Sequence, residues 1–472
     1  MGFKKKLYRY RPLREPPVPA QTTKYRVEPM SCDPGDLERG VRQLLADKVS
    51  GNLVGLWLLV PELLRLGVWD LLQRWTNSDT RRVEPRLALQ LVHESALCVT
   101  GVRHGRCLGQ RGFELANGLP FLATDEAIHD VLAEHTVADC QQLQLALGKL
   151  RRASGHFRAR TLAIDPHRVR SFSKRQMQKR RADEGRRPMK LAQMFFVLDT
   201  DTNQPICFTT GTSARTATTA AIEALGLAAE ILDPEPGQAL VLADCEHFTT
   251  TLLDHAKLQM PFDLLMPMPR RESVFKKLRA LLSESFQPRW AGYAIAKHTY
   301  TPHQSQAGPY PMYVQRNGER PEEYWYKVFL STSDRNEVEA LAHEFPKRWH
   351  VEEFFNANQA LGWDRAGTAD LNVRYGQMTA ALVAQAVIHQ FRQRLGAPAQ
   401  AWDAKHLAKS FFLGMEGDIR VKRDTIVVTY YNAPEADRLR AEYAQLPDRL
   451  RAERVDPRIP WLYGFQLDFR FR

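Results

Sequence analysis

The chain has 472 residues, of which 44% are hydrophobic and 25% are charged, as in ordinary globular proteins. This composition excludes a disordered, collagenous or coiled-coil chain. Lysine and arginine number 66 against 54 for aspartate and glutamate, a net charge of +12, which favours a polyanionic partner.

The six cysteines are scattered and none forms a C-x-x-C pair. This pattern argues against a disulfide framework or a cysteine zinc site, and predicts a reducing compartment. The basic N-terminus lacks the apolar segment of a signal peptide. The longest apolar run, residues 53–60, is far shorter than the ~20 residues of a spanning helix. We therefore expect a cytoplasmic chain without membrane contact.

The first third of the chain divides into an arm and a helical segment. Residues 1–36 are rich in Pro, Lys and Arg and lack apolar periodicity, which predicts a basic flexible arm. Residues 37–154 show helical spacing of Leu and Val, and Thr124-Asp-Glu-Ala resembles a helix start. We predict an all-helical DNA-binding domain here; a bundle that binds no ligand is the alternative.

Nearly all of the net charge lies in one segment. Residues 151–190 contain fourteen Lys and Arg and three acids, 14 − 3 = +11. Such a concentration predicts contacts to a phosphate backbone, with a solvated basic surface as the alternative. The residues expected to bind DNA are Arg180, Arg181, Arg186 and Arg187.

The next part alternates strands and helices, which predicts a mixed α/β sheet. We expect a β-rich insertion at about residues 268–322, helices from 336 to 395, and a mixed region at 396–472 with a β-like patch at 419–431. The expected strands are 161–165, 194–198, 205–208, 239–244, 262–266 and 324–330, and the expected helices among them are 216–232 and 249–258.

Three acidic residues stand out in this part. Asp165 and Asp244 each end an apolar strand, where side chains of α/β sheets point into the ligand crevice. Two adjacent carboxylates repel each other unless a cation such as Mg²⁺ joins them; simple capping of the following turn is the alternative. Glu352 and Arg348 are four residues apart on one helical face. A surface ion pair is the plain explanation, but the neighbouring Trp349, Phe354 and Phe355 predict that this helix packs on the core.

In this order, Asp165, Asp244 and Glu352 resemble the DDE triad of bacterial insertion-sequence transposases, which have an RNase H-like core. The segment Arg348-Trp-His-Val-Glu-Glu-Phe-Phe355 is similar to the Tyr-x2-Arg-x3-Glu-x6-Lys signature of the insertion sequence four family. The resemblance covers roughly residues 158–395. Phe345 stands where the family has Tyr, Gln359 stands where it has Lys, and Cys245-Glu-His follows Asp244 in place of Arg-Gly.

The resemblance implies an α/β fold in which an RNase H-like mixed sheet, residues 155–395, follows the helical domain. It implies two Mg²⁺ ions, with Mn²⁺ as a substitute, bound by Asp165, Asp244 and Glu352, and Arg348 on a phosphate near the cleaved bond. The activity implied is cleavage of the element's ends and their joining to double-stranded target DNA by two-metal phosphoryl transfer. A homodimer in the synaptic complex and a bacterial, nucleoid-associated location follow from the same resemblance.

Two alternatives stay open. The absence of the family's Tyr and Lys at Phe345 and Gln359 fits a catalytically inactive, transposase-derived DNA-binding protein, and the triad also fits an RNase H-fold nuclease. Asp199, which follows the strand at 194–198, is the alternative first carboxylate. We prefer Asp165 because an RNase H-like core begins with the strand that carries the first Asp and continues with a hairpin.

Overall fold

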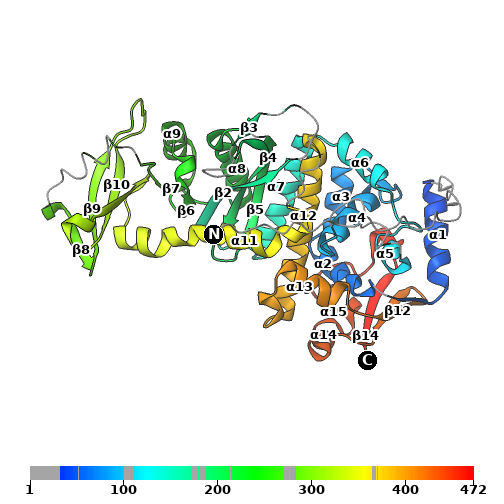
Figure 1. The fold of residues 1–472 in the computed structure, drawn as a ribbon. Helices are drawn as coiled ribbons and strands as arrows, with labels where there is room; N and C mark the ends of the chain where they lie inside the picture. Colours follow the sequence, from blue (N-terminus) through cyan, green and yellow to red (C-terminus); the bar gives the residue numbers. More distant parts are fainter. Residues whose placement is uncertain are drawn as a thin grey trace, which may run out of the picture.

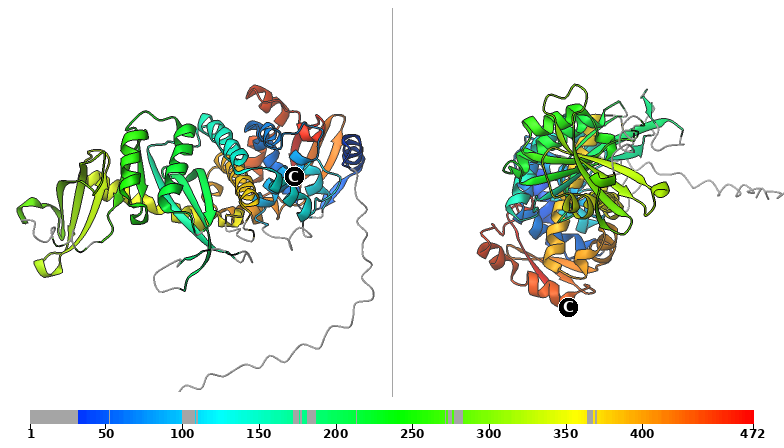
Figure 2. Two further views of the ribbon diagram at one scale, coloured as in Figure 1. Left: turned by 90° about the horizontal axis from the view of Figure 1, so that it is seen from above. Right: turned by 90° about the vertical axis from the view of Figure 1, so that its left-hand side faces the viewer.

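The computed structural model describes residues 32–472 except 52, 100–107, 109, 172–175, 177, 181–186, 213, 271, 273–275, 277–282, 364–367 and 369. Its parts form a row: helices at one end, a mixed sheet in the middle and an antiparallel β insertion at the other end (Figures 1 and 2). Residues 1–31 of the predicted arm lie outside the described part. The remainder of the arm is not extended, since the first helix already begins at Pro34, capped by the Asp33 side chain.

The segment predicted to be helical contains seven α-helices in the described part, and Thr124 caps one of them as expected. They are α1 (Pro34–Ala46), α2 (Val60–Arg65), α3 (Val68–Trp75), α4 (Glu84–Ala96), α5 (Arg111–Ala116), α6 (Asp125–Glu134) and α7 (Val137–Ala153), with the 3-10 helix η1 (Val54–Leu59) before α2. The segment is not purely helical, because β1 (Val49–Gly51) pairs with strand β12 (Gly417–Lys422) near the C-terminus.

The C-terminal region completes the same core. Here β12 and β13 (Thr425–Tyr430) form the predicted β patch, and β14 (Gln466–Phe471), which was not predicted, adds in parallel to β13. The helices of this region are α13 (Ala404–Leu407), α14 (Ala436–Tyr443) and α15 (Leu446–Ala452). One apolar cluster extends from Leu37 to Phe471, so the helical segment and the C-terminal region fold around shared residues.

The central sheet has the order β3-β4-β2-β6-β7-β11-β10-β9-β8, with β5 paired to β4. Strand β2 is antiparallel to β4 and parallel to β6, and β6 is parallel to β7. The predicted hairpin is present as β4 and β5. The strands are β2 (Thr161–Arg170), β3 (Lys179–Arg180), β4 (Met189–Asp199), β5 (Gln204–Thr212), β6 (Ala239–Ala243) and β7 (Phe262–Pro267).

Helices cover both faces of this sheet. On one face, α8 (Ala217–Leu232) and α9 (Thr250–Gln259) pack against side chains such as Leu162 and Ile164 of β2. On the other face, α11 (His350–Asn358) and α12 (Leu371–Leu395) pack against Phe196 and Phe208. Thr216 and Thr249 cap α8 and α9 through their side chains, close to the predicted starts of these helices.

The β insertion extends the sheet beyond β7. Its strands are β8 (Gln287–Trp290), β9 (Tyr293–Tyr300) and β10 (Tyr310–Asn317), and β11 (Trp325–Ser331) returns the chain to β7. All neighbouring pairs from β7 to β8 are antiparallel. The strands that the sequence predicted are therefore present: β4 and β5 are longer than expected, β11 is shifted by one residue, and β6 ends one residue early.

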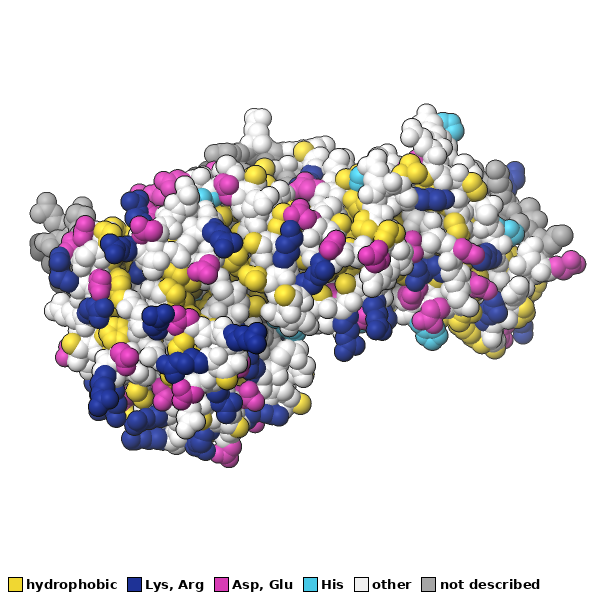
Figure 3. All heavy atoms as spheres, turned by 180° about the vertical axis from the view of Figure 1, so that it is seen from behind, with side chains coloured by type: hydrophobic (Ala, Val, Ile, Leu, Met, Phe, Trp, Pro, Cys, Tyr) yellow, Lys and Arg dark blue, Asp and Glu magenta, His cyan; other side chains and the backbone are white. Residues whose placement is uncertain are grey.

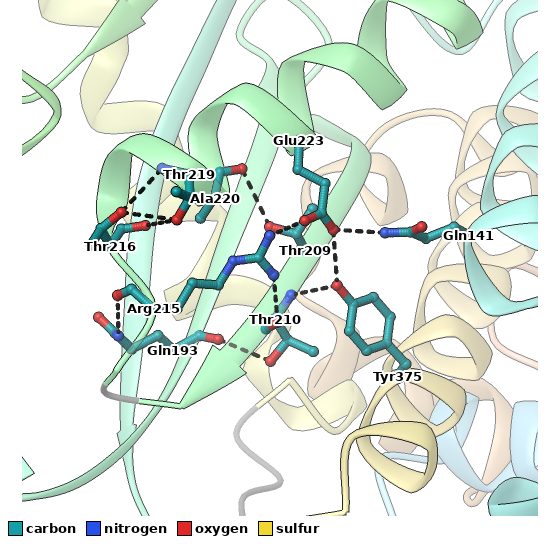
Figure 4. Close-up of polar contacts among 10 residues, drawn as sticks. All are labelled: Gln141, Gln193, Thr209, Thr210, Arg215, Thr216, Thr219, Ala220, Glu223 and Tyr375. Carbon is teal, nitrogen blue, oxygen red and sulfur yellow. Dashed lines mark hydrogen bonds and ion pairs between the residues drawn. The ribbon is translucent and has the colours of Figure 1, made fainter. Parts of the chain in front are cut away.

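A polar cluster fixes α12 and α7 to the sheet (Figure 4). Glu223 of α8 accepts hydrogen bonds from Gln141 of α7 (2.7 Å) and Tyr375 of α12 (3.3 Å), and pairs with Arg215. The Tyr375 hydroxyl also accepts from the backbone N–H of Thr210 on β5 (3.1 Å), and Arg215 donates to the Thr210 carbonyl (2.8 Å). Four elements are thus joined by one carboxylate and one hydroxyl.

No helix in the part of the chain that the structure describes is long and apolar enough to cross a membrane. The described cysteines that have free thiols include Cys98, Cys140, Cys207 and Cys245.

Candidate active site

Asp165 and Asp244 lie side by side on neighbouring parallel strands. The last paired positions of β2 and β6 are Ile164 and Ala243, and each aspartate is the next residue along its strand. The sequence predicted that this strand ends at Asp165. That prediction is wrong, because β2 continues to Arg170 along β4. Asp165 is therefore held within a strand, while Asp244 leads into the 3-10 helix η3 (Cys245–His247).

Both carboxylates project from the sheet face that α11 covers. Ala163 of β2 and Leu242 of β6 belong to the apolar cluster on that face, and side chains two residues apart on a strand share a face. His167, two residues after Asp165, stacks on Phe355 of α11 with ring centroids 4.1 Å apart. The sheet therefore directs Asp165 and Asp244 towards the helix that carries Glu352.

Glu352 lies in the first turn of α11, directly after the 3-10 helix η7 (Phe345–Trp349). Phe354 and Phe355 are buried against Phe196 of β4, as the sequence predicted for this helix. The same prediction is wrong for Trp349, which is 55% exposed. Packing thus fixes α11 on the sheet and leaves an aromatic ring beside the site in solvent.

Arg348 joins the first and third carboxylates. Its guanidinium lies 3.4 Å from Asp165 Oδ2 and 3.6 Å from Glu352 Oε1. The Arg348 side chain is 9% exposed, Asp165 is 15% exposed and Glu352 is 43% exposed. The guanidinium also lies over the Trp349 ring, 4.9 Å from its centroid. The predicted Arg–Glu pair is therefore present, and it also includes Asp165.

The electrostatics of Asp165 reflect crowded negative charge. Burial raises its pKa to about 7; Arg348 opposes this effect, whereas Asp244, Glu352 and Glu246 add to it. An ionised carboxylate at this position is costly without further positive charge. The site therefore favours a cation or a proton at Asp165.

Asp199 has different surroundings. Its buried carboxylate accepts hydrogen bonds from the backbone N–H groups of Arg158, Ala159, Asp201 and Thr202, at 2.6–3.1 Å. It pairs with Leu162 on β2, three positions from Asp165 towards the opposite end of the strand. The carboxylate of Asp199 thus organises the surrounding turns.

The residues fit a hard divalent cation in their chemistry. All three acids offer the oxygen ligands that Mg²⁺ prefers, Asp244 does not cap η3 through its side chain, and Asp165 lies in a field that disfavours its bare charge. Across the described segments, no group of three or more His, Cys, Asp and Glu side chains lies close enough to hold an ion. The predicted convergence is therefore partial, with Arg348 between Asp165 and Glu352.

The basic segment is only partly described. Arg181, Arg186 and the side chain of Arg180 lie outside the described residues, and Arg187 is exposed. Arg151 is fully buried and donates to the Pro205 carbonyl at 2.5 Å, so it belongs to the core. The contribution of the other arginines to DNA binding stays a prediction.

The two departures from the family signature have different positions. Phe345 is buried and meets Phe329 edge-on, with centroids 4.8 Å apart, whereas Gln359 is exposed after α11.

Sequence reasoning missed two charged residues of the site. Glu246, noted only as part of a departure from the family, pairs with Arg168 of β2. Lys327 of β11 lies far from the motifs in sequence and gave no signal.

Comparison with known protein families identifies a domain in the segment that contains these residues. Residues 156–386 match the family model of the transposase DDE domain, and this range contains all three acids and Arg348. The match supports a DDE transposase domain in this part of the chain. The cryo-EM structure of the piggyBac transposase synaptic complex with hairpin DNA is similar with a TM-score of 0.41 and 11% identity, over 78% of this chain and 82% of that chain. No curated protein matches the sequence.

Proposed function

We propose that the chain is a DDE transposase that binds the ends of a mobile element, cleaves them and joins them to target DNA. The observation that carries the proposal is the adjacency of Asp165 and Asp244 on parallel strands, with Arg348 linking Asp165 to Glu352. The matched transposase domain supports the same reaction class.

An RNase H-like core is part of this proposal. Five neighbouring strands of the sheet lie in the spatial order β5-β4-β2-β6-β7. The first of these five along the chain is β2, which carries Asp165, and the hairpin β4–β5 follows it. This arrangement supports Asp165 as the first carboxylate. Membership of the insertion sequence four family, and hence a bacterial insertion sequence as the substrate, rests on Arg348 and Glu352 alone, because Phe345 and Gln359 depart from the signature.

In the proposed mechanism, Asp165, Asp244 and Glu352 would hold two Mg²⁺ ions. Divalent cations at such a site activate the attacking oxygen and stabilise the leaving oxygen of a phosphoryl transfer. Asp165 and Asp244 are fixed by the sheet, and Glu352 completes the set from the more exposed α11. Arg348 donates to a phosphate near the cleaved bond through its planar guanidinium, which suits bidentate contacts.

Arg348 has a second role in this proposal. Without DNA it neutralises part of the charge of Asp165 and Glu352. On a bound DNA strand, its guanidinium would turn from the carboxylates to the phosphate, so the positive charge would stay in the site. The proposed partners are double-stranded DNA and a second copy of the chain in the synaptic complex.

A cleavage assay tests the proposal. Duplex DNA from the sequences that flank the coding region, including any inverted repeats, is incubated with the purified chain and Mg²⁺ or Mn²⁺. We expect cuts at fixed positions that disappear when EDTA is added. Binding of this DNA with no cleavage in either metal would favour the non-catalytic alternative, and cleavage of any structured nucleic acid without end specificity would favour the nuclease.

A further inference from the structure

Lys327 lies on the return strand of the β insertion and faces the proposed active site. It is two residues from Phe329, whose ring belongs to the apolar cluster on the α11 side of the sheet, so the two side chains share that face. Phe329 pairs with Pro267 of β7, and β7 is the parallel neighbour of β6, the strand that leads to Asp244. Lys327 thus projects from the same face as Asp165 and Asp244.

The Lys327 ammonium lies between two aromatic rings. Its Nζ is 4.9 Å from the centroid of Phe329 and 5.0 Å from that of Phe345. Burial lowers the pKa of Lys327; nearby Asp244 opposes this effect, and Arg348 adds to it. The ammonium is therefore within electrostatic reach of one proposed metal ligand and of the proposed phosphate-binding arginine.

Within the described part of the chain, Lys327 has no carboxylate in ion-pair contact. This distinguishes it from Lys297 of β9, which lies on the same sheet face and pairs with Asp334 at 2.5 Å, and from Lys347, which pairs with Asp201 at 3.4 Å. The two rings offset part of the cost of removing the ammonium from water. An anion from outside the chain could therefore serve as the ion-pair partner of the Lys327 ammonium.

We propose that Lys327 binds a backbone phosphate of the DNA strand, adjacent to the phosphate that Arg348 contacts. The inference rests on the proposed function and adds a residue to the substrate site. A DNA strand that reaches Asp165 and Asp244 brings a row of negative charges towards carboxylates. A cation beside Asp244 reduces this repulsion at the second phosphate, as Arg348 does at the first.

The test compares Lys327→Met, Lys327→Arg and the control Lys297→Met on duplex DNA from the flanks of the coding region. A second set of duplexes carries one uncharged methylphosphonate at each phosphate around the cleavage position in turn. The dissociation constant and the Mg²⁺-dependent cleavage rate are both measured. Methionine keeps the contact with Phe329 and Phe345 and removes the charge, and arginine restores the charge.

We expect Lys327→Met to weaken binding or slow cleavage by about tenfold or more, Lys327→Arg to recover most of the loss, and Lys297→Met to behave like wild type. One methylphosphonate position should weaken wild type but add nothing to the defect of Lys327→Met, and the salt slope of Lys327→Met should fall by about one. Equal losses on every substituted duplex, or wild-type behaviour of Lys327→Met, would overturn the inference. Absence of cleavage by wild type would instead contradict the proposed function, while the binding data would still decide the phosphate contact.

Discussion

Asp165 and Asp199 lie on neighbouring strands, but their carboxylates have opposite environments. Asp165 is buried among like charges, whereas Asp199 satisfies four backbone N–H groups. In metal-free buffer at pH 8, Asp165→Asn should leave the free energy of unfolding unchanged or raise it by about 1 kcal/mol, because a costly charge is removed. Asp199→Asn should lower it by about 1–3 kcal/mol, because an amide oxygen replaces two charged acceptors.

Urea unfolding and a cleavage assay on both variants check this contrast. Asp165→Asn should abolish cleavage while the fold is retained. Asp199→Asn should cleave at a rate set by its folded fraction. If Asp199→Asn stayed fully folded and inactive, Asp199 would be the first carboxylate of the site.

The sequence singled out Asp165, Asp244 and Glu352 because each stands in a local pattern: the end of an apolar run, or an i, i+4 pair with Arg348. It could not show that Arg348 also reaches Asp165, 183 positions away, because that contact depends on how α11 lies on the sheet. The sequence did not predict Lys327 as a site residue for the same reason. Its neighbours Phe345 and Asp244 become neighbours only when the β insertion returns to β7.

At the scale of elements, two mid-helix glycines offer a matched comparison. A Cβ on Gly148 of α7 would lie 2.7 Å from two atoms of the buried Ile231 side chain of α8, whereas a Cβ on Gly226 of α8 would meet nothing within 4 Å. Gly148→Ala should therefore lower the free energy of unfolding by about 1–3 kcal/mol through overpacking. Gly226→Ala should raise it by about 0.5–1 kcal/mol through helix propensity.

Chemical denaturation of both variants measures the two effects. Equal and positive effects would mean that α7 and α8 are not in close contact as the structure has them. The pair is informative because both changes add the same methyl group to a helix interior.

Strands and helices with strong local patterns were predicted well. The hairpin β4–β5 and the helices α8 and α9 are present with longer or slightly shifted bounds, and the predicted insertion is β-rich. Strand β14 was missed because its pairing partner, β13, lies some forty residues away and its own alternation is short. Strand β1 was missed because three residues in a helical segment carry no periodic signal.

At the scale of the whole molecule, we expect DNA affinity to depend more on where the positive charge lies than on the total net charge. Seen from behind, Lys and Arg are dense over the C-terminal region at the lower left (Figure 3). Several of them are paired with nearby acids, including Arg440 with Asp437 and Arg451 with Asp448. We expect paired arginines of this kind to contribute less to phosphate binding than an unbalanced basic segment such as 151–190.

Replacing Arg180, Arg181, Arg186 and Arg187 by Gln should reduce the slope of log affinity against log salt by about three to four. The control replaces four arginines that pair with acids, Arg39, Arg440, Arg451 and Arg458, and changes the net charge equally. Its slope should change much less. DNA binding titrations at several salt concentrations compare the two variants; equal slopes would make the 151–190 segment an ordinary solvated surface.

Four buried histidines in the described part of the chain predict how its stability depends on pH. Burial lowers the pKa of His93 and His247 to about 4, that of His389 to about 3, and that of His156 as well. Above the ordinary value of 6.5 these rings are neutral in both states and have no effect. Below it the unfolded chain takes up protons that the folded chain excludes, so stability should fall by about 1.4 kcal/mol for each histidine and pH unit.

Unfolding by urea between pH 7.5 and 5.5 measures this dependence. Ordinary carboxylates stay ionised in this range, and Asp165, whose pKa is raised to about 7, offsets the contribution of about one histidine below pH 7. His389→Gln should show a shallower decline than wild type. A wild-type stability that is constant over this range would show that the four rings are accessible to protons in the folded chain.

The central claim is that Asp165, Asp244 and Glu352 form the metal-binding triad of a DNA-cleaving enzyme, and the pair Glu352→Gln and Glu353→Gln tests it most directly. Both changes remove one negative charge from adjacent positions of α11, but Glu353 is exposed and outside the site. The measurement is the rate of Mg²⁺-dependent cleavage of end DNA, with DNA affinity determined alongside. We predict that Glu352→Gln binds DNA and loses cleavage by about a thousandfold or more, while Glu353→Gln cleaves like wild type. Normal cleavage by Glu352→Gln would contradict the account.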